Sequence, residues 1–356
     1  MRFPHSLLVA ALSLTLGSCK SIHMPKWNFG KKADAEAGES EKDRGKRETA
    51  ESAFLEECKK LGTSGDTVTG KDGWIFTGKE LKQLGATPEV GSGSFSSAVT
   101  AISDYRRQLK QSGVEMVVVV VPPKALIYAD KVSTEAKVPM KKGVPLPLDS
   151  YYVAAAEALT KKGVKVVSLT EAFLKERKGK GGAPFVKGSA KFTPSAAKLI
   201  AQTVAEEVGL SKGEAGMVAK DLEFTGGNEL GGKEEKLTAR QIFRADGTTP
   251  ISLGETGNTI LMIADNSVKD WKDQQASLAE QLSFESQRNV GVLTGSSARN
   301  EQRLKVMRLG TTSKNPLSGT KLVVWVCNAL ELASGDWDVV PLKLEFKMSD
   351  PTIRIN

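Results

Sequence analysis

The histidines of this chain decide which catalytic chemistry its sequence allows. Only two of the 356 residues are histidine, His5 and His23, and both lie near the amino terminus. Imidazole has an unperturbed pKa near neutrality, so it is the usual base beside a serine or cysteine nucleophile and the commonest metal ligand. The sequence therefore excludes a Ser-His-Asp hydrolase, a Cys-His protease and a His-ligated zinc enzyme as ordinary interpretations. It predicts no cofactor and no metal site.

Two cysteines in the body of the chain could form a disulfide, but a second interpretation is open. Cys58 lies on an expected helix over 53–60, and Cys327 ends a strongly apolar strand. An exported protein can oxidise such a pair. Free cysteines are also common small buried hydrophobes, and spacing alone cannot bring two Cα atoms within bonding range.

Other patterns that could carry chemistry are weaker. The glycine-rich segments 178–182 and 226–232 lack the Gly-Lys-Ser/Thr ending of a phosphate-binding loop, and we expect flexible loops there. Trp271 and Trp325 could stack on a sugar ring, although burial is the usual fate of tryptophan. The net charge of +8 is spread along the chain. The sequence has no pattern of basic residues interleaved with aromatic ones, so we expect no nucleic-acid partner.

The amino terminus predicts export and a lipid anchor. Arg2 precedes an apolar run, Leu7 to Leu16, that is too short to span a membrane. The quartet Leu16-Gly17-Ser18-Cys19 resembles a bacterial lipobox, which implies cleavage after residue 18 and lipidation of Cys19. By resemblance to lipoprotein sorting signals, Lys20 favours the outer membrane, facing the periplasm. The anchor makes the membrane a predicted partner.

The rest of the chain divides into a linker and one large domain. Residues 19–49 are rich in Lys, Glu, Gly and Asp, which is typical of a lipidated, flexible, charged tether. Residues 50–356 are long enough for a single α/β domain.

Strands alternate with amphipathic helices through this domain. We expect strands over 114–121, 164–169, 259–263, 289–293 and 322–326, and helices containing Ala98 to Leu109, Tyr151 to Lys162, a helix capped by Thr193, and Val268 to Leu282. This alternation predicts a doubly wound, mostly parallel sheet with helices on both faces. Ligands of such folds bind where the strands end. The segments to examine are therefore 122–124, 187–194, 264–267 and 328–331.

Five short motifs in these positions resemble the periplasmic SGNH hydrolase-like proteins of alginate O-acetylation. In the order of that family they are Asp72-Gly73-Trp74-Ile75-Phe76, Val121-Pro122-Pro123-Lys124, Lys191-Phe192-Thr193-Pro194, Ala264-Asp265-Asn266-Ser267 and Val323-Val324-Trp325. The resemblance implies an SGNH hydrolase-like fold. It also implies a site that moves acetyl groups to or from a polysaccharide, using a serine nucleophile and an Asp-x-His pair.

The residues at those catalytic positions depart from the family pattern. The Asp-x-His pair falls on Ser189 and Lys191, and the Gly-Asp-Ser block falls on residues 264–266, with Ser267 one place late. Loss of one member of such a unit removes most of a contribution of roughly 10⁶-fold. The favoured interpretation is a catalytically degenerate relative that acts in polysaccharide binding or envelope assembly. Its expected partners are an anionic or acetylated polysaccharide and envelope assembly proteins.

The alternative is an active acetyltransferase or acetylesterase, so the sequence alone does not decide whether the chain is an enzyme. Lysine replaces histidine as the base of some serine enzymes. In that case the candidate catalytic residues are Ser267, Lys191, Ser189 and Asp265. Lys191 would have to be buried enough to lose its proton near neutrality. The simpler interpretation makes Lys191 a solvated loop residue and Ser267 the N-cap of the helix expected from Val268.

Overall fold

The computed structural model describes residues 41–132, 135, 137–178, 182–335 and 337–342. The expected signal peptide, Cys19 and most of the expected linker lie outside these residues. Among the described helices, none is both long enough and apolar enough to cross a bilayer. The end of the expected linker, residues 41–49, is helical and mostly exposed, and it opens helix α2 (Glu41–Leu61).

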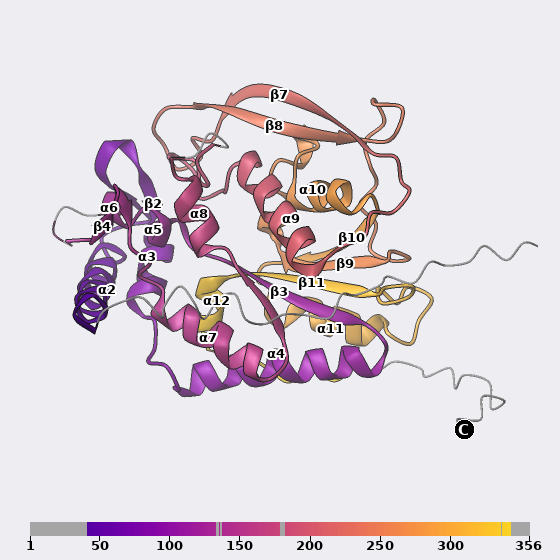
Figure 1. Cartoon of the computed structure of the whole chain (residues 1–356), viewed down its shortest axis with the longest axis horizontal. Helices are drawn as coiled ribbons and strands as arrows, with labels where there is room; N and C mark the ends of the chain where they lie inside the picture. The colour runs from indigo at the N-terminus through magenta and orange to yellow at the C-terminus, as the bar shows by residue number, and fades with distance from the viewer. Residues whose placement is uncertain (1–40, 133–134, 136, 179–181, 336, 343–356) are drawn as a thin grey trace, which may run out of the picture.

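A five-stranded parallel sheet forms the centre of the molecule, as the alternation of strands and helices predicted (Figure 1). Its strand order is β10-β9-β11-β3-β6. The bounds are β3 (Glu115–Val121), β6 (Lys165–Ser168), β9 (Ile260–Asp265), β10 (Val290–Gly295) and β11 (Leu322–Asn328). Along the chain, β3 and β6 form first, and β9 and β10 follow on the other side of the sheet. The last strand, β11, then lies between β9 and β3. The carboxyl ends of β3, β9 and β11 therefore meet at one edge of the sheet.

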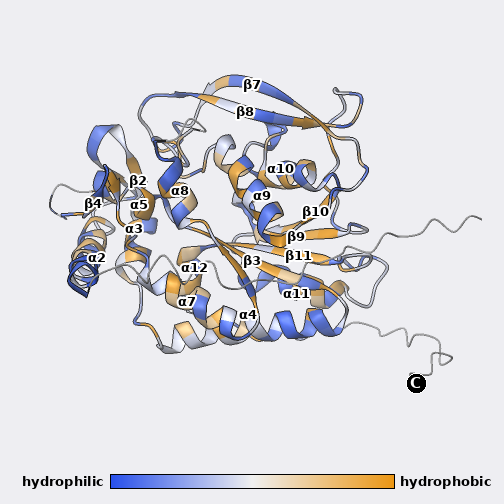
Figure 2. Ribbon diagram, viewed as in Figure 1, coloured by the Kyte–Doolittle hydropathy of each residue, from blue (hydrophilic) through white to orange (hydrophobic). Residues whose placement is uncertain are grey.

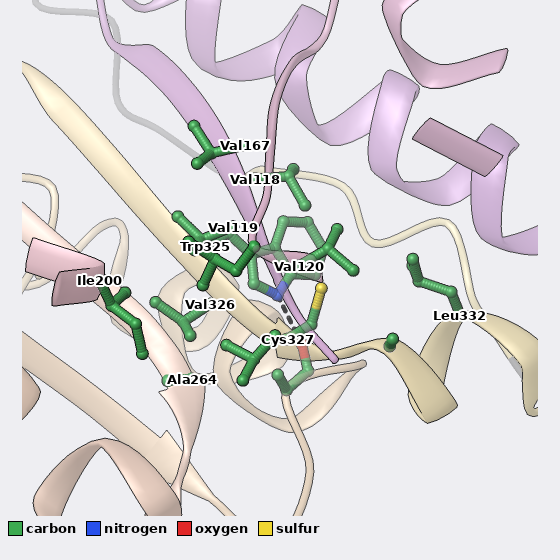
Figure 3. Close-up of a cluster of buried hydrophobic side chains, with 14 of the residues drawn as sticks. Val118, Val119, Val120, Val167, Ile200, Ala264, Trp325, Val326, Cys327 and Leu332 are labelled. Atoms are coloured by element: carbon green, nitrogen blue, oxygen red, sulfur yellow. Dashed lines mark hydrogen bonds between the residues drawn. The ribbon is translucent and has the colours of Figure 1, made fainter. Parts of the chain in front are cut away.

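The central strands are continuous apolar runs because helices cover both of their faces. Figure 2 shows these strands as the most hydrophobic part of the fold. Trp325 on β11 lies opposite Val118 on β3 and is fully buried. Figure 3 shows its ring beside Val118 and Val120 of β3.

Helices α9 (Pro194–Val208) and α10 (Leu278–Ser286) lie on one face of the sheet, and α4 (Gly93–Gln111), α7 (Ser150–Lys161), α11 (Glu301–Leu309) and α12 (Ala329–Ala333) lie on the other (Figure 1). Thr193 caps α9, as expected: its Oγ1 accepts from the Ala196 N–H at 3.1 Å, and Pro194 occupies the first turn.

Smaller elements complete the fold at the strand ends. They are β1 (Thr67–Thr69), η1 (Lys71–Gly73), β2 (Ile75–Thr77), α3 (Gly78–Gly85), α5 (Lys124–Ile127), α6 (Ala129–Val132), β4 (Met140–Lys141), β5 (Val144–Pro145) and α8 (Thr170–Glu176). The Asp72-Gly73 turn joins β1 to β2, and both Asp72 (φ 56°) and Gly73 (φ 76°) adopt the left-handed conformation that such a turn requires. Trp74 and Phe76, which follow this turn, are buried.

The prediction of one helix over Val268 to Leu282 is wrong. The segment forms two short 3-10 helices, η2 (Asn266–Lys269) and η3 (Lys272–Gln274), before α10 begins. Trp271 (φ 66°) and Gln275 (φ 49°) are left-handed, which interrupts a right-handed helix. Apolar spacing alone does not signal these breaks.

Strands β7 (Val218–Gly226) and β8 (Glu235–Phe243) form an antiparallel hairpin between α9 and β9 that the sequence analysis missed. Figure 1 shows the hairpin above α9 and α10. The segment 226–232, expected to be a flexible loop, belongs to its tip. The tip packs on the 186–191 loop: a Cβ on Gly188 would lie 2.3 Å from the Gly231 carbonyl oxygen.

Cys58 and Cys327 are both free and buried. The structure therefore supports the buried-hydrophobe interpretation of the two cysteines, and burial raises the pKa of both thiols.

Candidate functional site

A cavity of about 230 Å³ lies where the central strands end. Its lining comes from the β2–α3 corner, the ends of β3, β9 and β11, and the loop before α9. The residues that line it are Thr77, Lys79, Glu80, Gln83, Val121, Pro122, Pro123, Lys124, Phe185, Ala190, Lys191, Phe192, Asp265, Ser267, Asp270, Val326, Asn328 and Leu330. The cavity therefore joins three of the five motifs found in the sequence, those at 121–124, 191–194 and 264–267, at the position expected for a doubly wound fold.

Lys191 lies at the wall of this cavity and forms an ion pair. Its Nζ donates to Glu229 Oε1 at 2.5 Å and lies 5.3 Å from the centre of the Trp271 ring. The Lys191 side chain is 36% exposed. A carboxylate and an aromatic ring thus both contact the Lys191 amine.

Ser267 is engaged by the residue two places before it. Its Oγ donates to Asp265 Oδ1 at 2.5 Å, and its N–H donates to the same oxygen at 2.8 Å. Asp265 is the N-cap of η2. The expectation that Ser267 caps this helix is therefore wrong: the cap lies two residues earlier, and Ser267 belongs to the first turn.

Ser189 lies beneath the wall rather than in the cavity. It is 1% exposed, and its Oγ accepts from the Lys191 N–H at 3.2 Å. The structure thus brings Asp265, Ser267 and Lys191 to one cavity and leaves Ser189 as a buried support of the loop. Among the hydrogen bonds of the described residues, none joins Lys191 Nζ to Ser267 Oγ.

Two acidic residues of the site were missed by the sequence analysis. Glu229, at the hairpin tip, is the partner of Lys191; burial raises its pKa, but hydrogen bonds from Lys191 and Ser189 outweigh burial and lower it overall. Asp270 lines the cavity beside Lys191. Neither has a sequence signal, because one lies on an unrecognised hairpin and the other lies in the segment misassigned to a long helix. Among the described residues, no group of three or more His, Cys, Asp or Glu could hold a metal ion.

Asp270 should make the stability of the protein depend on pH. Burial raises its pKa from 3.8 to about 6; Lys191 opposes the shift, and Asp265 and Glu229 add to it. Between these two values the folded chain keeps a proton that the unfolded chain has lost, so the free energy of unfolding falls as pH rises through this window.

We expect Asp270→Asn to reduce the pH-dependent decrease in the free energy of unfolding by about 1 to 2 kcal/mol, a value that allows for the partial solvent exposure of Asp270. The measurement is urea unfolding at a series of pH values from 3.5 to 7. The matched control is Asp273→Asn, at an exposed position in η3. Equal pH profiles for wild type and Asp270→Asn would contradict the assignment.

The two tryptophans considered as sugar platforms do not serve that purpose. Trp325 is fully buried, and its Nε1 donates to the Ala298 carbonyl at 2.8 Å. Trp271 is 9% exposed, and its Nε1 donates to the Phe192 carbonyl at 2.7 Å. Lys191 covers the Trp271 ring, so a sugar has no open aromatic face here.

Known proteins resemble this chain in sequence and in fold. A family model described as "SGNH hydrolase-like domain, acetyltransferase AlgX" matches residues 67–244, from β1 through β8. The match includes Lys191 and ends before Asp265. The probable alginate O-acetylase AlgJ of Pseudomonas aeruginosa is 26% identical over 141 residues, which cover 40% of this chain and 32% of AlgJ. The matched region thus spans about a third of that relative.

Two solved structures share the fold. The O-acetyltransferase domain of Pseudomonas putida AlgJ superposes with a TM-score of 0.57 at 18% identity, over 76% of this chain and 93% of that domain. AlgX of Pseudomonas aeruginosa gives a TM-score of 0.51 at 16% identity, over 74% of this chain and 62% of AlgX. With the family model covering half of the sequence, the chain belongs to the SGNH hydrolase-like family of AlgX-type acetyltransferase domains.

Proposed function

We propose that this chain is a polysaccharide-binding member of the family that has lost acyl transfer. The observation that carries the proposal is the separate pairing of its two candidate catalytic groups. Lys191 Nζ is bound to Glu229, and Ser267 Oγ is bound to Asp265. A serine enzyme needs a base that takes the proton of its nucleophile, and only a neutral amine can do so.

The contacts of Lys191 suit a use other than that of a catalytic base. Glu229 accepts its hydrogen bond, and Asp270 lies close enough to interact electrostatically with it. An ammonium held at a cavity wall can bind an anionic group of a ligand by exchanging one carboxylate partner for another.

The other lining residues suit a hydroxyl-rich ligand. Lys79, Gln83 and Asn328 bring amine and amide groups to the opposite side of the cavity, from α3 and the end of β11. Such groups donate to hydroxyl and carboxylate oxygens. The proposed ligand is therefore an anionic or acetylated polysaccharide of the alginate type.

The proposed place of action is the periplasmic face of the outer membrane. The quartet that ends in Cys19, and Lys20 after it, support a lipid anchor there. A charged segment before the fold would let the site reach a polymer or envelope assembly proteins near the membrane.

Isothermal titration of the full chain, purified in detergent, with acetylated and deacetylated alginate oligosaccharides tests the binding function. We expect Lys191→Met to weaken binding about tenfold, the loss of one charge-assisted contact of about 1.4 kcal/mol. Lys187→Met, at an exposed position on the same loop, is the control and should bind as wild type does. Failure of the wild type to bind either oligosaccharide at millimolar concentration, or equal binding by the two variants, would contradict the proposal.

The second candidate function is an acetyltransferase or acetylesterase that uses a Ser267-Lys191 dyad. The observation that favours it is that both residues line the same cavity. For that chemistry, Lys191 would have to leave Glu229, lose its proton and reach Ser267, whose hydroxyl would in turn have to leave Asp265.

A further inference from the structure

Lys124 is a buried cation that contributes to the wall of the candidate site. It follows β3 at the start of α5 and is 2% exposed. Its Nζ donates three hydrogen bonds to backbone carbonyls: to Ile75 at 2.6 Å, to Lys187 at 2.7 Å and to Ser189 at 2.9 Å. Ile75 belongs to β2, whereas Lys187 and Ser189 belong to the loop that carries Lys191.

The surroundings of Lys124 match a protonated amine. An ammonium has three N–H donors and no acceptor, which is the set that three carbonyl oxygens require. The rings of Trp74 and Phe76 lie 5.2 Å and 5.3 Å from Nζ, within the range of cation–π attraction. Burial lowers the pKa of Lys124 to about 8, with Glu80 and then Glu235 opposing the shift, so the amine keeps its proton at pH 7.

The loop also makes hydrogen bonds that do not involve Lys124, among them one from the Val186 N–H to the Lys191 carbonyl at 3.3 Å. The Ile75 N–H donates to the Lys187 carbonyl at 3.0 Å, the Lys187 N–H donates to Glu235, and the Leu230 N–H donates to the Gly188 carbonyl. The carbonyls of Lys187 and Ser189 thus accept hydrogen bonds from Lys124, and the Lys187 carbonyl also accepts one from Ile75 of β2. Without the ammonium, the Ser189 carbonyl would be buried with no donor from Lys124, which costs roughly 1 to 3 kcal/mol.

We propose that Lys124 is the positioning residue of the site: its ammonium ties the 187–191 loop to β2 and thereby sets Lys191 between Glu229 and the Trp271 ring. In this role Lys124, at the end of β3, holds together β2 and the 187–191 loop, which lie far apart in the sequence. It does not depend on whether the cavity binds polysaccharide, because it concerns the position of Lys191 in the free protein.

The test observes Lys191 directly. Reductive methylation with ¹³C-formaldehyde labels accessible lysine amines and keeps their charge, and the Lys191 signal is assigned by its loss in Lys191→Arg. Because Lys191 Nζ lies over the face of Trp271, its dimethyl signal should be shifted upfield by the ring. Lys124, which is 2% exposed and has its Nζ bonded to three carbonyls, should stay unlabelled in the folded protein.

In Lys124→Met we expect the Lys191 signal to lose its upfield shift while circular dichroism still shows a folded protein. Lys187→Met, which removes an exposed amine 6.0 Å from the Trp74 ring, should leave the Lys191 signal in place. An unchanged Lys191 signal in Lys124→Met overturns the proposal.

If Lys124→Met does not fold, the same measurement on Lys124→Gln decides, since glutamine keeps two N–H donors at shorter reach. Failure of both variants to fold would also overturn the proposal, because Lys124 would then be needed by the whole fold rather than by this loop. None of these outcomes depends on the oligosaccharide titration, so the two proposals can fail separately.

Discussion

Arg303→Ala should lower the free energy of unfolding by about 3 to 5 kcal/mol, because it removes one partner of a buried polar network. Arg303 on α11 is fully buried. Its Nε donates to the Arg299 carbonyl at 2.7 Å, its Nη1 donates to the Asp338 carbonyl at 2.9 Å, and its Nη2 donates to Asn300. Alanine would leave two backbone carbonyls without this donor.

The guanidinium also lies among three aromatic rings, at 5.2 Å from the centre of Trp325, 5.7 Å from Trp337 and 5.8 Å from Tyr105. Burial lowers its pKa to about 10, so it stays charged at neutral pH and these cation–π contacts persist. Arg303 therefore joins the chain after β10 and the segment around Asp338 to the centre of the sheet.

Urea unfolding followed by circular dichroism measures the effect. Arg308→Ala is the matched control, since Arg308 lies on the same helix and is exposed, and it should change stability by less than about 0.5 kcal/mol. A loss of under 1 kcal/mol in Arg303→Ala would show that the network contributes little.

The second large effect is expected at Trp271, which supports the candidate site from below. Its ring packs with Val186, Leu237, Ala239 and Ala276 in a small core that joins the β7–β8 hairpin to the rest of the domain. Its edge meets Phe224 at a centroid distance of 5.6 Å. Trp271→Ala should cost about 3 to 5 kcal/mol through the cavity left in this core.

A milder substitution distinguishes the contribution of ring packing from that of the Trp271 hydrogen bond. Trp271→Phe keeps most of the packing but removes the N–H that donates to the Phe192 carbonyl, and should cost about 1 to 2 kcal/mol. Both residues would occupy the same left-handed backbone position, so the comparison leaves backbone strain unchanged. Equal losses in the two variants, by the same urea measurement, would contradict the packing explanation.

The sheet could be predicted because its strands carry their own signal. The valine run before Pro122 and the apolar runs ending at Asp265 and Cys327 are buried on both faces, and continuous apolar runs bounded by turns mark such strands. The order of the motifs then placed Lys191, Asp265 and Ser267 at one edge. The structure confirms that these three line one cavity.

The hairpin could not be predicted in the same way. β7 is largely exposed and lacks the continuous apolar run that marks the strands of the sheet; its only strand signal is the polar–apolar alternation over Asp221 to Thr225, which was not recognised. Its tip reads as a glycine-rich loop. Glu229, the ion-pair partner of Lys191, lies at this tip, and the sequence did not reveal it because an acidic residue in a polar loop has no periodicity that indicates its partner.

The role of Ser267 was misjudged for a related reason. A serine before an apolar periodic stretch is a common N-cap, and Asp265 two residues earlier is an equally good one. The choice depends on where the backbone turns after β9. The Asp265 backbone is still extended (φ −75°, ψ −178°) and η2 begins at Asn266, so the cap is Asp265 and not Ser267.

The central proposal, that the site binds polysaccharide without transferring acyl groups, is tested most directly by following acetate release during binding. The full chain is mixed with acetylated alginate oligosaccharide at the concentrations of the titration, and free acetate is measured by proton NMR at pH 7 and pH 9. The predicted result is saturable binding with acetate release no faster than in Ser267→Ala at either pH. Acetate release by the wild type that disappears in both Ser267→Ala and Lys191→Met would contradict the proposal and establish the Ser267-Lys191 dyad instead.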